Sequence, residues 1–297
     1  MSVRPSPTTA SATPPDLDIV PATSTSEVAS TQAELIAVGG AEDKEDRKVV
    51  LNHFYTLAGG DDANIVVIPA ASGIPDILSE LYRKVFTSLG ARPDRVSTLD
   101  IRNPIEARNP AAVELIESCT AIYFTGGDQE RLADVLGGTS LMKLIYQRWQ
   151  QGQAIIGGTS AGASALGHQM ISRGYSGETP TPSLVTIKAG LGILPHAIVD
   201  QHFHNRNRLA RLLTAIAYHP DCLGIGIDED TAAVIRADNT LEVIGSGTVT
   251  LVDGRASTTN IADLASDRPY TLHDTKLHFL VSGATFDLAS GQPVARA

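Results

Sequence analysis

Residues 157–164 read GGTSAGAS and contain the pattern G-x-S-x-G centred on Ser160. An apolar run precedes the pattern and small residues follow it, which is the strand–turn–helix setting that such a serine nucleophile requires. Because the turn is sharp, Gly158 and Gly162 must lack side chains. The helix amino terminus would direct free N–H groups toward an oxyanion formed there. We therefore interpret Ser160 as a nucleophile in preference to a residue of an ordinary glycine-rich turn.

A second glycine turn, TGGDQ at residues 125–129, also follows an apolar strand. In an open parallel sheet, ligands bind beyond the carboxyl ends of the strands, so both glycine turns should lie at one edge. The N–H group of Gly126 or Gly127 could then pair with that of Ala161 as an oxyanion hole, and Gln129 would face the cleft. A simple strand-to-helix turn explains this segment equally well when it is considered alone.

A dense polar cluster, DQHFHNRNR at residues 200–208, separates an apolar strand from a helix. Its two histidines, His202 and His204, are candidates for the general base that a serine nucleophile needs. They could instead bind a metal ion, but no third ligand has a helpful spacing, so we expect no metal site. The arginines of this region either form a solvated helix face or bind carboxylates in bidentate pairs; they are Arg206, Arg208 and Arg211.

Three consecutive carboxylates, Asp228, Glu229 and Asp230, follow the short apolar run GIGI. A serine–histidine pair needs an acidic acceptor that holds the imidazole in the correct tautomer. Glu229 and its neighbours are candidates for that acceptor, and so is Glu178 in the loop GETP. Spacing does not choose among them, and a carboxylate cluster after a strand is often only a turn.

Apolar runs and amphipathic segments alternate along the chain. The predicted strands are residues 34–38, 64–69, 96–101, 121–124 and 154–157, and the predicted helices are residues 43–57, 77–89, 111–118 and two within 131–150. Strands separated by such helices predict crossover units, and hence a parallel sheet covered on both faces. From about Gly224, short apolar runs follow one another closely. We therefore expect an α/β fold with a mostly parallel central sheet flanked by helices, and a β-rich carboxyl-terminal end that extends the same sheet.

The first 31 residues differ from the rest, because 17 of them are serine, threonine or proline. Such a composition cannot bury enough apolar surface to offset the entropy of ordering, so residues 1–31 should be a flexible tail. Neither a linker nor an internal repeat follows it. Residues 32–297 should therefore form a single α/β domain.

The composition of the 297 residues narrows the function class. Hydrophobic residues make up 42% and charged residues 19%, which excludes a mainly disordered chain or a coiled coil. A net charge of −10 argues against nucleic acid as a partner. The two cysteines have no metal-binding spacing, no apolar run is long enough to span a membrane, and the amino terminus lacks the apolar centre of a signal peptide. We therefore expect a cytoplasmic protein.

Taken together, the four polar segments resemble the cyanophycinase family in their order along the chain. These segments are GGDQ at 126–129, GTSAGA at 158–163, DQHFHNRNR at 200–208 and GIDEDT at 226–231, and the likeness runs from about Leu35 to near the carboxyl terminus. The family consists of serine peptidases related to aspartyl dipeptidase. Its fold is flavodoxin-like and shared with class I glutamine amidotransferases.

The resemblance implies hydrolysis of cyanophycin, a poly-aspartate that bears arginine on each side-chain carboxyl, to β-aspartyl-arginine dipeptides. Ser160 matches the family nucleophile, His202 its general base and Glu229 its third triad member, with Glu178 as the second choice. The positions that match the family's substrate pocket are Gln129, Asp200, Gln201, Arg206, Arg208 and Arg211. The resemblance also implies that no metal or organic cofactor is needed, and family habit suggests a homodimer.

The sequence alone leaves three alternatives to this interpretation. One is an aspartyl or isoaspartyl dipeptidase that acts on short peptides, and another is an esterase of the α/β-hydrolase type. The third is a binding module that has kept the fold and lost turnover, against which the presence of both Ser160 and His202 argues. A glutaminase is disfavoured because Ser160 stands where those enzymes have cysteine, and His204 where they have glutamate.

Overall fold

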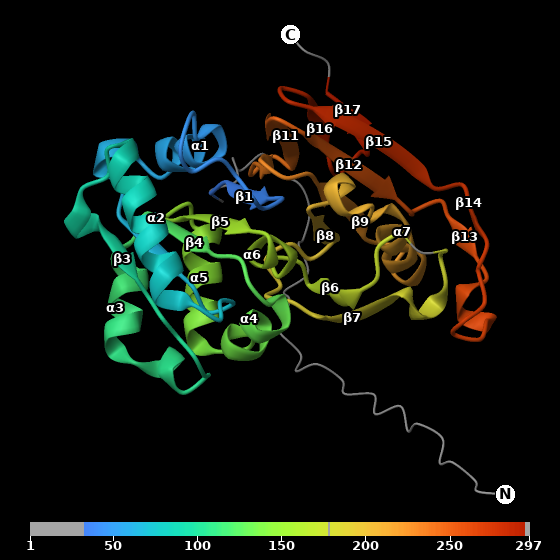
Figure 1. The fold of residues 1–297 in the computed structure, drawn as a ribbon, viewed down its shortest axis with the longest axis horizontal. Helices are drawn as coiled ribbons and strands as arrows, with labels where there is room; N and C mark the ends of the chain where they lie inside the picture. The colour runs from blue at the N-terminus through green and yellow to red at the C-terminus, as the bar shows by residue number, and fades with distance from the viewer. Residues whose placement is uncertain (1–32, 178, 295–297) are drawn as a thin grey trace, which may run out of the picture.

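The computed structural model describes residues 33–177 and 179–294 (Figure 1). The predicted tail, residues 1–31, lies outside the described residues, and so does Glu178. The α-helices are α1 (Val49–Leu57), α2 (Pro75–Leu89), α3 (Pro110–Ser118), α4 (Gln129–Leu136), α5 (Ser140–Gln150), α6 (Ala161–Ser164) and α7 (Leu209–Tyr218).

Within the described ranges the strands form one large sheet and three smaller ones. The nine strands of the large sheet are β1 (Leu35–Val38), β2 (Ile65–Ile68), β3 (Val96–Thr98), β4 (Ala121–Phe124), β5 (Ile155–Thr159), β10 (Thr231–Ile235), β11 (Thr240–Gly245), β16 (Thr285–Asp287) and β17 (Gln292–Pro293). A four-stranded sheet contains β8 (Ala197–Gln201), β9 (Leu223–Ile227), β12 (Thr248–Asp253) and β15 (Lys276–Val281). Two hairpin-like pairs complete the set: β6 (Gln169–Gly174) with β7 (Val185–Ala189), and β13 (Thr258–Thr259) with β14 (Leu272–His273).

The large sheet is mixed, with the strand order β17-β16-β11-β10-β1-β5-β4-β2-β3. Strands β1, β5, β4, β2 and β3 pair in parallel, whereas β10, β11, β16 and β17 pair antiparallel with their neighbours. The α/β class is confirmed, but the expectation of a mostly parallel sheet was wrong. The physical reason is that only a short turn joins β10 to β11, and a short turn permits antiparallel pairing alone.

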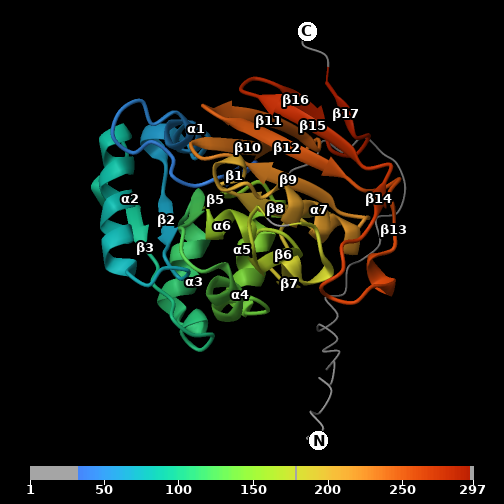
Figure 2. The ribbon, with the colours of Figure 1, turned by 45° about the vertical axis from the view of Figure 1, so that its right-hand side comes forward.

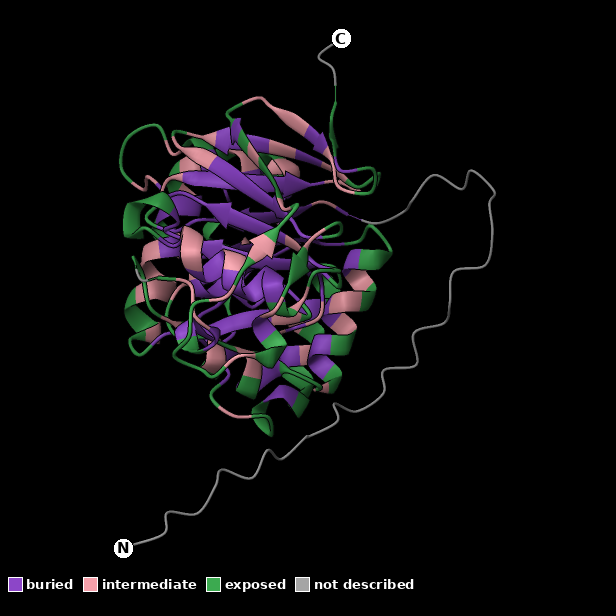
Figure 3. Cartoon of the chain, turned by 90° about the vertical axis from the view of Figure 1, so that its right-hand side faces the viewer, coloured by how far each residue is buried: buried purple, intermediate pink, exposed green. Residues whose placement is uncertain are grey.

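Helices lie on both faces of the parallel strands (Figures 1 and 2). On one face, the ring of Tyr123 in β4 packs against Phe54 of α1 and Phe86 of α2, with ring centroids 5.0 and 5.7 Å apart. The next residue of β4, Phe124, contacts Gly162 of α6. Because successive side chains of a strand point to opposite faces, α6 lies on the face opposite to α1 and α2. The central strands are therefore buried on both sides, as the purple interior of Figure 3 shows.

The carboxyl-terminal strands extend the large sheet only in part. Strands β10, β11, β16 and β17 continue it, but β9, β12 and β15 join β8 in the separate four-stranded sheet (Figure 2). The chain passes from β11 to the other sheet directly after Gly245, the last residue of β11, which has a φ of 105° that favours glycine. Strand β8 pairs in parallel with β9, and helix α7 forms the crossover connection between the two strands. The polar cluster that follows β8 is thereby carried to the same edge as the turn after β5.

The predicted helix 43–57 was too long at its start, because α1 begins at Val49. The carboxylate of Asp43 accepts hydrogen bonds from the backbone N–H groups of Glu45, Asp46 and Lys48, each at 2.9 Å. These bonds hold a turn in place of the first helical turns, and Lys48 then has a left-handed φ of 49°. None of the helices in the described ranges has the length and apolar character that a membrane span requires.

Candidate active site

Ser160 occupies a tight turn between β5 and α6. Its backbone has φ 51° and ψ −111°, a conformation that a non-glycine residue adopts only when its surroundings enforce it. The N–H group of Ser160 donates to the carbonyl of Val38 at 3.0 Å, which ties the turn to the end of β1. The serine hydroxyl is thus presented at the carboxyl edge of the parallel strands, as the G-x-S-x-G pattern predicts.

The two glycines of the pattern permit a close contact between β5 and α6. A side chain on Gly158 would lie 2.7 Å from the carbonyl group of Gly162. A side chain on Gly162 would in turn collide with the backbone of Phe124. Any larger residue at either position would push α6 away from the sheet and move Ser160 with it.

His202 follows the last residue of β8 and faces Ser160. Its Nε2 atom lies 3.0 Å from Oγ of Ser160, and its side chain is largely buried. The backbone of His202 also has a positive φ of 48°, and its N–H group donates to the carbonyl of Gly39 at 2.8 Å. Gly40 packs against the imidazole, since a Cβ atom there would lie 2.5 Å from Cε1 of the ring.

Glu229 is the carboxylate that meets the other nitrogen of the imidazole. Its Oε1 atom lies 2.6 Å from Nδ1 of His202, and its backbone N–H donates to Oδ1 of Asn205 at 2.9 Å. A continuous chain of contacts therefore joins Ser160, His202 and Glu229. The alternative acid, Glu178, lies outside the described residues.

The environment of His202 favours the neutral imidazole. Burial is the largest cause that lowers its pKa below the ordinary value of 6.5, and the positive charges of Arg206 and Arg208 act in the same direction. The hydrogen bond and the charge of Glu229 oppose this shift. A neutral imidazole that donates from Nδ1 to Glu229 leaves the Nε2 lone pair free to accept a proton from Ser160.

The oxyanion-hole donors expected from the sequence are Ala161 and either Gly126 or Gly127. Ala161 is the first residue of α6, so its N–H group has no acceptor within the helix. Gly126 is close to the serine, since a Cβ atom on Gly126 would lie 3.9 Å from Oγ of Ser160. Gly127, the alternative donor to Gly126, has a φ of 146° and packs closely against the backbone of Ala71.

The structure gives Gln129 a contact that the sequence does not reveal. Its Nε2 atom donates to the carbonyls of Ile171 at 3.0 Å and Ser172 at 2.9 Å, which ties α4 to β6. The amide donors of Gln129 are therefore used within the chain, whereas its amide oxygen makes no hydrogen bond to the described residues.

Asp200, Arg208 and Arg211 form a buried ion cluster behind the serine. Both oxygens of the fully buried Asp200 accept from the guanidinium of Arg211, and Nη1 of Arg208 lies 3.4 Å from Oδ1. Arg208 also donates to Oε1 of Gln201 at 3.0 Å, and that oxygen lies 3.5 Å from Oγ of Ser160. Burial lowers the pKa of Arg208 to about 10, and it stays charged at neutral pH. Asp200 is thus already engaged by this chain's own arginines.

Arg206 and His204 differ from the buried cluster because both are exposed. No ion pair of Arg206 occurs among the described residues, although its charge acts on the nearby His202. His204 points elsewhere, since its Nε2 atom lies 2.9 Å from the Thr250 hydroxyl and its ring stacks on Phe279. No group of three potential metal ligands was found in the described part of the chain.

Sequence reasoning did not single out Glu42, which lies four residues after the end of β1. It is only 3% exposed and accepts a hydrogen bond at 2.7 Å from the hydroxyl of Thr159, the residue before Ser160. The signal that could have revealed it is its position in GGAE, an acidic residue directly after a strand-ending glycine turn at the same sheet edge.

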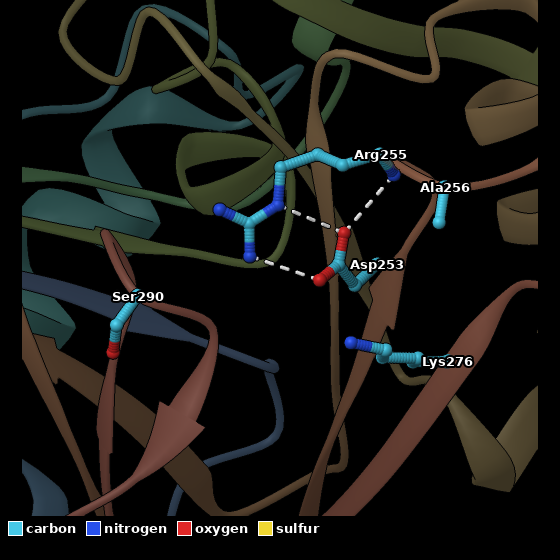
Figure 4. A pocket seen from close by; sticks show the side chains of 5 residues that line it. All are labelled: Asp253, Arg255, Ala256, Lys276 and Ser290. Atoms are coloured by element: carbon cyan, nitrogen blue, oxygen red, sulfur yellow. Dashed lines mark hydrogen bonds and ion pairs between the residues drawn. The ribbon is translucent and has the colours of Figure 1, made fainter.

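A separate polar hollow of about 220 Å³ lies among the carboxyl-terminal strands (Figure 4). In it, the guanidinium of Arg255 binds both oxygens of Asp253 at 3.0 and 2.9 Å, and Lys276 lies beside them. Arg255 also donates to the carbonyl of Ala289 at 2.9 Å. The guanidinium of Arg255 thus donates its hydrogen bonds to the protein itself. Ser160, His202 and Glu229 do not line this hollow.

Comparisons with known proteins show what the chain as a whole is similar to. A cyanophycinase of Geminocystis herdmanii is 49% identical over 265 residues, which are 89% of this chain and 97% of the relative. A cyanophycinase of a Nostoc species is 46% identical over 260 residues, or 87% of each chain. A solved structure of a peptidase from an acI-B1 Actinobacterium is 26% identical, with a TM-score of 0.59 over 82% of this chain and 96% of that one. Residues 35–243 match the profile of Peptidase family S51, and the chain therefore belongs to this family of serine peptidases.

Proposed function

We propose that this protein is a cyanophycinase, a serine peptidase that cleaves the poly-aspartate backbone of cyanophycin and releases β-aspartyl-arginine. The observation that carries the proposal is the chain of contacts from Oγ of Ser160 to Nε2 of His202 at 3.0 Å, and from Nδ1 to Glu229 at 2.6 Å. The cyanophycinases that are 46–49% identical over most of this chain support the choice of substrate.

In the proposed acylation step, Nε2 of His202 accepts the hydroxyl proton as Oγ of Ser160 attacks the scissile carbonyl carbon. The N–H group of Ala161, together with that of Gly126 or Gly127, holds the negative oxygen of the tetrahedral intermediate. As the intermediate collapses, His202 gives its proton to the departing amine, and the acyl group stays on Ser160 as an ester. Glu229 stabilises the imidazolium that exists between these proton transfers.

Deacylation repeats the same chemistry with water as the nucleophile. His202 takes a proton from water, the resulting hydroxide attacks the ester carbon, and the proton returns to Oγ of Ser160. The product carries the new carboxylate away. Every proton is accounted for by Ser160, His202, water and substrate, and we propose that neither a metal nor an organic cofactor takes part.

We infer the groups that bind the substrate from the charged side chains of the site that are not already paired within the protein. Because both oxygens of Asp200 are bound by Arg208 and Arg211, we propose that these three residues, with Gln201, shape the pocket wall rather than meet the polymer as free charges. Arg206 is the exposed cation beside His202, so it is suited to bind a carboxylate of the polymer. The oxygen of the Gln129 amide, which no described residue binds, is suited to accept from a substrate guanidinium.

Several wider expectations belong to the same proposal. We propose a fold related to flavodoxin and to class I glutamine amidotransferases, with residues 32–297 as one catalytic domain behind the amino-terminal tail. We further propose exopeptidase action in the cytoplasm by a homodimer that does not use nucleic acid as a partner.

The experiment that tests the function is incubation of the purified protein with insoluble cyanophycin, with Ser160→Ala as the matched control. Release of β-aspartyl-arginine by the wild type alone, detected by mass spectrometry, is the expected result. If the wild type leaves cyanophycin intact but hydrolyses short aspartyl or isoaspartyl peptides, the dipeptidase alternative replaces this proposal.

A further inference from the structure

The loop at residues 39–43, directly after β1, contacts each of the three segments that carry the serine, the histidine and the glutamate. The carbonyl of Gly39 accepts from the N–H group of His202 at 2.8 Å. The carbonyl of Gly40 accepts from the N–H group of Asp230, the neighbour of Glu229, at 2.9 Å. The side chain of Glu42 reaches Thr159, the neighbour of Ser160. One short loop therefore connects all three.

Glu42 is the only side chain of this loop that is buried beneath the serine turn, at 3% exposure. Its Oε2 atom accepts from the hydroxyl of Thr159 at 2.7 Å, and its Oε1 atom accepts from Tyr82 at 2.6 Å and Tyr123 at 3.1 Å. The ammonium of Lys44 lies 3.2 Å from Oε1. Three hydroxyls and one ammonium, all able to donate, thus converge on a carboxylate that can only accept.

Tyr82 and Tyr123 fix the position of the Glu42 carboxylate. Tyr82 belongs to α2 and Tyr123 to β4, and the latter is fully buried among aromatic rings. Burial, followed by the charge of Glu42, raises the pKa of both phenols well above their ordinary value, so they remain donors at any physiological pH. Hydrogen bonds from Tyr82 of α2 and Tyr123 of β4 therefore fix the carboxylate of Glu42, and this carboxylate in turn fixes the hydroxyl of Thr159.

This arrangement matters because Ser160 has a strained backbone. A non-glycine residue at φ 51° and ψ −111° is strained, and this conformation persists only where neighbouring groups enforce it. The backbone bond to Val38 fixes one side of the residue, and the side chain of Thr159 fixes the other. Without the second contact, the turn can relax and the distance from Oγ of Ser160 to Nε2 of His202 can grow.

We propose that Glu42 is a positioning residue for the serine nucleophile, acting through Thr159 and through the loop at residues 39–43. Glu42 touches neither substrate nor the reacting atoms. This inference rests on the proposed function in one respect, namely that Ser160 is the nucleophile.

The test uses covalent labelling of Ser160 by a fluorophosphonate, because this reaction needs an aligned serine and histidine but no cyanophycin. Glu42→Gln keeps the size of the side chain but turns one acceptor into a donor that faces a hydroxyl. We expect its labelling rate and its kcat on cyanophycin to fall together by roughly tenfold to a hundredfold, since a misplacement of about 1 Å has such an effect. KM should change by less than about threefold, because the loop does not bind substrate.

A second pair of variants separates positioning from folding. Thr159→Val removes the hydroxyl at constant shape, whereas Thr159→Ser keeps it. The serine variant should retain most of the wild-type labelling rate and the valine variant should lose it, with rates counted per folded molecule after thermal unfolding has been measured for each.

The results that overturn the inference are distinct from those that overturn the function. If the wild type is labelled and Glu42→Gln or Thr159→Val is labelled equally fast, Glu42 has only a structural role. If Glu42→Gln does not fold, the comparison of Thr159→Val with Thr159→Ser decides alone. If the wild type itself is not labelled while Ser160 is intact, the proposed function fails instead.

Discussion

Nδ1 of His202 lies 2.6 Å from Oε1 of Glu229, while the two carboxylates beside Glu229 are bound elsewhere. Asp228 accepts from the N–H group of His204 at 2.9 Å and from the hydroxyl of Thr248 at 2.7 Å. Asp230 accepts from the N–H group of Asp43 and from the hydroxyl of Ser246. Three adjacent acids thus have separate partners, and only the middle one meets the imidazole.

Glu229→Gln should reduce kcat strongly with a small change in KM. An amide accepts more weakly than a carboxylate and cannot stabilise the imidazolium, so a loss on the order of 10²–10⁴-fold is expected. Steady-state hydrolysis of cyanophycin measures it, with Asp228→Asn as the neighbouring control. Asp228→Asn should lower the unfolding temperature but leave kcat close to the wild-type value, because Asp228 binds His204 and Thr248 and does not contact the imidazole. Equal kinetic losses in both variants would argue against a special role for Glu229.

The rate of Ser160 labelling should rise with pH through an apparent pKa below 6.5. Burial of His202 and the adjacent arginines lower its pKa, and only the neutral ring can accept the serine proton. The reactive form is therefore present above this pKa and is lost as the pH falls through it. Arg206→Gln removes a positive charge, so the acid limb should move to higher pH. Labelling with a fluorophosphonate between about pH 4 and 9 measures the limb; a shift to lower pH would contradict this account.

Gly40→Ala should lower activity because the new methyl group needs the space of the imidazole. The φ of Gly40 is 95°, and its Cβ atom would lie 2.5 Å from the His202 ring. We expect at least a roughly tenfold loss of kcat, since the ring must move away from Ser160. Gly138→Ala is the matched control, because Gly138 also has a positive φ, of 69°, but open space around the new atom. The idea fails if both variants hydrolyse cyanophycin at the same rate.

Asp200→Asn should destabilise the fold. It leaves Arg211 and Arg208 buried without a full negative charge, and breaking one side of a buried ion pair typically costs about 3–5 kcal/mol. The free energy of unfolding from urea titration measures the effect. The control is Arg83→Gln, which removes an exposed pair with Glu80 and should cost less than about 1 kcal/mol. If Asp200→Asn lowers the free energy of unfolding no more than Arg83→Gln does, the ion cluster of Asp200 is accessible to water in solution.

The sequence predicted the parallel half of the fold well because each of its strands is a short apolar run. The run 121–124 coincides with β4, and the predicted helix 77–89 differs from α2 by two residues at its start. The prediction failed where long-range pairing decides the outcome. Nothing in the runs after Gly224 distinguishes β10, which joins the large sheet, from β12, which joins the smaller one.

From the sequence alone, Ser160 was assigned to a turn between a strand and a helix, because glycine spacing and apolar runs are local signals. The sequence likewise placed the histidine cluster and the three acids after strands. Their spacing left open which histidine would meet the serine and which acid would meet that histidine, although the family resemblance pointed to His202 and Glu229. The tertiary structure decided both, since β8 and the turn after β9 converge on the loop after β1. It alone also revealed that Asp200 is paired by Arg211 and that Glu42 supports Thr159. Contacts between residues 117 positions apart, such as that of Glu42 with Thr159, depend on how the strands are ordered in space, which no local pattern encodes.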